Sequence, residues 1–129
     1  MPINTYEENR ILSASPIELV RILYSAASRA VRDARRRLRD GDISGRSREI
    51  TRAQEILLEL ATAVDPTKAP ELGERLLALY DYMQGRLVAA NTQQKDSPLG
   101  EVADLLDTLQ EAWSQCPTVE APEMALAGR

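Results

Sequence analysis

The chain has 129 residues, with no histidine, no phenylalanine and one cysteine, and its only aromatic residues are four tyrosines and one tryptophan. Without histidine it has no Ser-His-Asp or Cys-His nucleophile pair. A single cysteine excludes both an ordinary zinc site and an intramolecular disulfide, so a reducing compartment such as the cytosol suits this composition. The length suits one domain of common size.

Charge is distributed unevenly along the chain. The net charge is −4, yet residues 21–52 hold ten arginines and four acidic residues, and the remainder carries a net −10. No segment approaches the ~20 continuous apolar residues of a membrane span. The first ten residues, MPINTYEENR, lack the apolar region of a secretory signal. We therefore expect a cytoplasmic protein.

The first predicted helix begins at Pro16. Ser15 can cap it, proline suits the first helical position, and Glu18 can complete a capping box. Gly41, between two aspartates, can supply the left-handed residue that ends the helix. Apolar residues spaced by three and four form one helical stripe between these points. They are Val20, Tyr24, Ala27, Val31, Ala34 and Leu38.

A second helix is predicted to start near Asp42 or Ser44. Pro66 and Pro70 end it, because each proline disfavours helical geometry in the residue before it. Its stripe contains Ile50, Ala53, Leu57, Leu60 and Val64.

Two further helices are predicted, one from Pro70 to near Asn91 and one that starts at Asp96-Ser97-Pro98. The stripe of the third helix is Leu72, Leu76, Leu79, Met83, Leu87 and Ala90. The stripe of the fourth is Leu99, Val102, Leu106, Leu109, Trp113 and Cys116.

These elements predict an all-α fold, an antiparallel up-down four-helix bundle. Helices of roughly 17 to 24 residues joined by loops of about 2 to 6 are typical of that architecture. The single domain over 1–129 would comprise a short N-terminal capping segment (1–15), the helical bundle (16–115) and a mobile tail (116–129).

The run Arg29–Arg39 admits two interpretations. Its arginines could contact phosphates, which would make the chain a small helical nucleic-acid-binding or regulatory protein. They also lie off the apolar stripe, and no aromatic residue between Tyr24 and Tyr80 offers a stacking platform. A solvated face, or one that pairs with an acidic neighbour, is the simpler interpretation. The fourth helix could be that neighbour, through Glu101, Asp104, Asp107 and Glu111.

No residue set points to catalysis, a cofactor or a metal. The carboxylate pairs are of the kind found on exposed helices, and the glycines form no phosphate-binding loop. The third helix has surplus apolar residues instead, since Tyr82 and Val88 fall off its stripe. It is either the most central helix or one that offers a second face to a partner. Gly85 within this helix either permits a neighbouring backbone to approach closely or is a neutral substitution that the helix tolerates.

Taken together, these segments resemble the flagellin export chaperone family, FliS. The resemblance runs in order from residue 6 to residue 113, and the combination of motifs is more specific than any one of them. The matching stretches are Tyr6, residues 11–16 (ILSASP), Leu19-Val20, Leu23-Tyr24, residues 41–43 (GDI), residues 53–57 (AQEIL), residues 79–83 (LYDYM), Arg86-Leu87, Ala90-Asn91, Leu105-Leu106, Leu109 and residues 111–113 (EAW).

The resemblance implies a non-enzymatic cytoplasmic chaperone without cofactors. It would bind the C-terminal segment of flagellin, prevent premature polymerisation and aid delivery to the flagellar type III export apparatus. An export-gate component, anti-sigma factor or co-chaperone are further possible partners, and the chain could be a monomer or a homodimer. The expected flagellin-binding residues are Tyr6, Leu12, Leu76, Tyr80, Tyr82, Met83 and Leu87.

The chain departs from the family pattern at two points. Gly85 stands before Arg86 where the family usually has a basic residue, which puts one contact in doubt. The loop Lys68-Ala69-Pro70 replaces the frequent Gly-Gly and is expected to change loop geometry alone.

Overall fold

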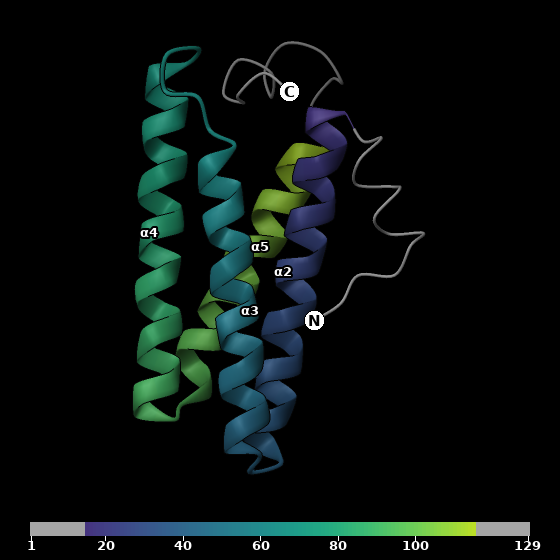
Figure 1. Ribbon diagram of the computed structural model, residues 1–129, viewed down its shortest axis with the longest axis vertical. Helices are drawn as coiled ribbons and strands as arrows, with labels where there is room; N and C mark the ends of the chain where they lie inside the picture. Colours follow the sequence, from purple (N-terminus) through teal and green to yellow (C-terminus); the bar gives the residue numbers. More distant parts are fainter. Residues whose placement is uncertain (1–14, 116–129) are drawn as a thin grey trace.

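The computed structural model describes residues 15–115, and the segments 1–14 and 116–129 lie outside the described part. Four helices follow one another: α2 (Pro16–Arg39), α3 (Ile43–Thr62), α4 (Pro70–Gln93) and α5 (Asp96–Gln115). Each helix packs against the next, and α5 closes the ring against α2 (Figure 1). Successive helices run in opposite directions, which confirms the predicted antiparallel up-down bundle.

The polar residues predicted to delimit α2 do so. The Ser15 hydroxyl accepts a hydrogen bond from the Glu18 amide at 3.3 Å. At the other end Gly41 has a φ of 72°, and its amide donates to the Leu38 carbonyl at 3.2 Å. The Asp42 amide then donates to the Arg37 carbonyl at 2.9 Å. This pair of bonds is the Schellman motif that a left-handed glycine permits.

The ends of α3 and α4 show what sequence signals capture and what they miss. Asp42 caps α3 by accepting a hydrogen bond from the Gly45 amide at 2.9 Å, so the helix starts at Ile43, between the two predicted starting points. Helix α4 runs to Gln93, two residues beyond the predicted end near Asn91. It ends because Gln94 adopts a left-handed conformation, with a φ of 56°. That conformation is uncommon for a residue other than glycine, so no residue type at this position signals the end of the helix.

The predicted stripes form most of the core. Leu38 and Leu109 are only partly buried, and the predicted stripe residue Cys116 lies outside the described residues. Leu72 was expected to face the core but is 39% exposed, and Gly73 is buried in its place. A Cβ on Gly73 would lie 3.2 Å from Val64 Cγ1, so glycine lets α4 approach the chain that leaves α3. Leu79 is only partly buried. The largest fully buried apolar side chains are Tyr24, Ile50, Leu57, Leu60, Met83, Leu87, Leu99 and Leu106.

Ion pairs tie α5 to both of its neighbours. The Arg35 guanidinium on α2 donates to both carboxylate oxygens of Asp96, at 2.8 and 2.7 Å. Arg86 on α4 donates to Glu101 at 2.6 Å. Basic α2 thus lies beside acidic α5, as the charge pattern suggested, although the residue that pairs with it is Asp96 rather than one of the four acids named above.

Candidate partner-binding face

Helix α4 has two sides with different roles, and its predicted binding residues are divided between them. Leu76, Tyr80, Met83 and Leu87 point into the bundle, and none is more than 6% exposed. The closed bundle covers all four. Their proposed contact with a partner stays a prediction, because a partner could touch them only where the bundle opens.

Tyr80 belongs to a buried polar cluster that links three helices. Its hydroxyl and that of Tyr24 are 2.5 Å apart, and Trp113 Nε1 donates to the Tyr24 hydroxyl at 3.1 Å. The Tyr24 hydroxyl therefore serves both other groups. Desolvation by burial raises the pKa of both tyrosines, so they stay neutral near neutral pH. This cluster fixes α2, α4 and α5 relative to one another.

The other side of α4 presents apolar side chains to solvent. Tyr82 is 48% and Val88 54% exposed, and Ala78 and Gly85 are exposed between and beside them. We call these four residues the α4 outer face. An added Cβ on Gly85 would meet no atom within 4 Å, so this glycine is not needed for close packing inside the bundle. The bundle therefore leaves a second side of α4 uncovered, and the binding of a partner to that side stays a prediction.

Polar contacts fix the position of Tyr82 on this face. Its hydroxyl donates to Glu101 Oε2 at 2.7 Å, while Arg86 binds the other oxygen of the same carboxylate. The hydrogen bond to Glu101 raises the pKa of Tyr82. The hydrogen bond from Tyr82, and to a smaller extent the one from Arg86, lowers the pKa of Glu101. One edge of the ring is therefore held while almost half of the side chain stays free for contact.

Two of the predicted binding residues lie outside the described residues, and one exposed apolar residue was not predicted as a binding residue. Tyr6 and Leu12 are outside the described residues. Leu58 on α3 is 64% exposed, although it was not chosen as a binding residue. The signal for Leu58 was present, since it follows the stripe residue Leu57 and must point elsewhere on a helix.

Other kinds of site find no support in the part of the chain that the structure describes. Residues 15–115 contain no group of three or more Cys, Asp or Glu side chains placed to hold a metal ion. None of the four described helices is long and apolar enough to cross a membrane.

Comparison with known proteins identifies the family of this chain. The model of the family described as flagellar protein FliS matches residues 1–120. The chain belongs to this family. The flagellar secretion chaperone FliS of Salmonella typhimurium is 35% identical over 109 residues, which cover 84% of this chain and 81% of that protein. The FliS of Bacillus subtilis is 31% identical over 114 residues, covering 88% and 84%. That of Campylobacter jejuni is 30% identical over 112 residues, covering 87% and 88%.

The FliS match includes all four helices and the α4 outer face. The large apolar residues that are exposed in the described part of the chain lie on α3 and α4.

Proposed function

We propose that this chain is a cytoplasmic export chaperone that binds the C-terminal segment of flagellin. It prevents premature polymerisation and aids delivery to the flagellar type III export apparatus, and it acts by binding rather than by catalysis. Membership of the FliS family carries the proposal. The exposed apolar residues of α4 support it, because a chaperone must offer surface that replaces the contacts its client makes later.

Among the predicted contacts within residues 15–115, Tyr82 is the one that is accessible without opening the bundle. Its ring is 48% exposed, and Val88 lies six residues further along the same helix with 54% exposure. An amphipathic segment that folds on binding could lay its apolar side over these residues and the bare backbone at Gly85. Leu76, Tyr80, Met83 and Leu87 support this surface from beneath. Tyr6 and Leu12 remain proposed contacts.

Calorimetry with a flagellin C-terminal peptide tests the proposal. The unaltered chain should bind at tens of micromolar or tighter, and the absence of heat at such concentrations would remove the proposed function. The double variant Y82S/V88S should weaken binding at least ~10-fold, since it removes two exposed apolar anchors.

Two variants separate contact loss from other effects. Ile43 is equally exposed but lies at the start of α3, so I43S should change affinity less than about 2-fold. Y82F keeps the ring and loses the hydrogen bond to Glu101, so near-normal affinity would assign the contact to the ring. If I43S and Y82S/V88S weaken binding equally, the α4 outer face is not the binding site.

A further inference from the structure

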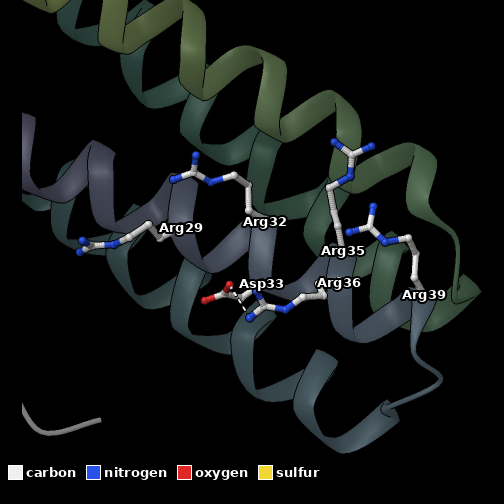
Figure 2. A pocket seen from close by; sticks show the side chains of 6 residues that line it. All are labelled: Arg29, Arg32, Asp33, Arg35, Arg36 and Arg39. Carbon is white, nitrogen blue, oxygen red and sulfur yellow. Dashed lines mark hydrogen bonds and ion pairs between the residues drawn. The ribbon is translucent and has the colours of Figure 1, made fainter.

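Five arginines lie on the side of α2 that faces away from the core. Together with Asp33 they line one shallow hollow of about 530 Å³ (Figure 2). We call them the arginine face: Arg29, Arg32, Arg35, Arg36 and Arg39. Residues 21–52 contain ten arginines and no lysine, so guanidinium groups supply all the positive charge of this part of the chain.

Carboxylates neutralise two of the five arginines. Arg35 pairs with Asp96 at 2.7 Å, and Arg36 pairs with Asp33 at 3.0 Å. Among residues 15–115, the other three arginines have no carboxylate within 4.0 Å. They are Arg29, Arg32 and Arg39. Three positive charges therefore remain around the hollow within the described bundle.

The type and spacing of these three side chains suit phosphate. Arg32 and Arg39 are seven residues apart, so they lie on one side of α2, about 10 Å from each other along its axis. Arg29 lies one turn before Arg32. A guanidinium is a rigid fork of N–H donors that can bind two oxygens of one phosphate at once, which an ammonium cannot do. Two phosphate groups carry a charge of about −3 to −4 near neutral pH, which matches the three unneutralised arginines.

We propose that the arginine face binds a compact anion with two or more linked phosphate groups, as in a nucleoside polyphosphate or a short inorganic polyphosphate. The volume of the hollow is within the range of small-molecule sites, about 300–1,000 Å³. None of the six residues that line it is aromatic, so a base would have no ring to stack on there. The phosphate groups therefore supply the recognised chemistry.

Acidic residues beside the arginine face favour a compact ligand over a long polyanion. Asp40 is exposed directly after α2, and Asp104 and Asp107 are exposed on α5. The hydrogen bond from Ser28 on α2 to Gln110 on α5, at 2.9 Å, places these α5 residues beside the same stretch of α2. A nucleic acid laid along α2 would pass these carboxylates and be repelled by them, whereas a ligand confined to the hollow contacts mainly arginine.

This site is separate from the proposed flagellin-binding surface. Helix α4 contacts α3 and α5, and it lies diagonally across the ring from α2. The inference therefore does not rest on the proposed function, and either one can fail without the other.

Calorimetric titration of the full chain with inorganic tripolyphosphate, and separately with ATP, tests the proposal. At about 0.02 M salt each should bind with a dissociation constant below ~0.1 mM, and affinity should fall at least ~10-fold near 0.3 M salt as the charges become screened. Equal affinities would show that the phosphate groups alone are recognised. Tighter binding of ATP would identify a nucleotide as the better ligand.

Two double variants locate the site. R32A/R39A should weaken the binding of tripolyphosphate at least ~10-fold. Neither side chain takes part in an ion pair within residues 15–115, so this variant keeps the described ion pairs of the bundle. The matched control K68A/R75A removes two positive charges at exposed positions outside the hollow and should stay within about 2-fold. Circular dichroism would show that each variant is folded.

Substitution of Asp33 should have the opposite effect. D33N removes the one carboxylate that lines the hollow and leaves Arg36 unneutralised, so it should tighten the binding of tripolyphosphate at least ~3-fold. No heat with either ligand, equal weakening by both double variants, or weaker binding by D33N would each overturn the proposal. A single-stranded oligonucleotide or anionic lipid vesicles that bind through Arg32 and Arg39 more tightly than tripolyphosphate would also overturn it, since the arginine face would then serve a polymer or a membrane.

Discussion

The buried cluster of Tyr24, Tyr80 and Trp113 predicts that Y80F destabilises the unaltered chain but not the Y24F variant. Y80F removes the hydroxyl that meets Tyr24, while the Tyr24 hydroxyl keeps the bond from Trp113 Nε1. Loss of one such bond should lower the free energy of unfolding by about 1 kcal/mol. Y24F removes the shared group and leaves both the Tyr80 hydroxyl and the Trp113 N–H without their partner. At ~1–3 kcal/mol for each unpaired buried group, the loss should be about 2–4 kcal/mol.

The double variant distinguishes this arrangement from independent contributions. In the Y24F background, Y80F removes a buried hydroxyl that has already lost its partner, so it should be neutral or raise the free energy of unfolding by about 1 kcal/mol. Urea unfolding followed by far-ultraviolet circular dichroism measures all four corners of the cycle, and emission of the sole tryptophan reports locally on the cluster. Equal losses from Y80F in both backgrounds would refute the shared role of the Tyr24 hydroxyl.

Three further substitutions test other parts of the bundle by the same unfolding measurement. G85A should stabilise the chain by about 0.5–1 kcal/mol, because alanine favours helix and an added Cβ meets no neighbour; destabilisation would show a hidden close approach. D42A should cost about 1 kcal/mol by removing the cap that accepts from the Gly45 amide, whereas D42N should recover most of it. The hydrogen bond from Arg35 lowers the pKa of Asp96 below its unfolded value of about 4, so the pair stabilises the fold above that pH and the effect is lost as pH falls through the folded pKa. D96N should therefore cost less than about 1 kcal/mol at neutral pH, and this cost should shrink as the pH falls below about 4; a cost that does not change with pH would contradict this.

Contacts that join distant parts of the chain were not visible in the sequence. Tyr24 meets Tyr80 across 56 positions and Trp113 across 89. The stripes predicted that Tyr24 and Trp113 face the core, whereas Tyr80 was predicted as a partner contact. The spacing of apolar residues says nothing about which hydroxyl meets which donor. The pairing arises because the ring of helices brings α2, α4 and α5 together at one level. Arg35 likewise meets Asp96 because the closure of the ring makes the first and last described helices neighbours.

In the candidate site, too, some features follow from the sequence and others only from the packing of the helices. The sequence separated Tyr82 and Val88 from the main stripe of α4, and the structure exposes both. It also proposed Leu76, Tyr80, Met83 and Leu87 as contacts, and these are buried. A binding surface and a core use the same apolar residue types at the same helical spacing, so periodicity cannot distinguish them. The distinction depends on whether a neighbouring helix covers the side.

The sequence by itself determined where the helices begin, where α2 ends, how apolar and charged residues divide between their sides, and the absence of histidine and phenylalanine. These features are local, since caps, left-handed glycines and prolines act within one or two turns. Tertiary structure decided which apolar residues are covered and which acid meets Arg35. Each of these depends on the relative height and neighbours of helices far apart in the chain, and packing of the whole bundle sets both.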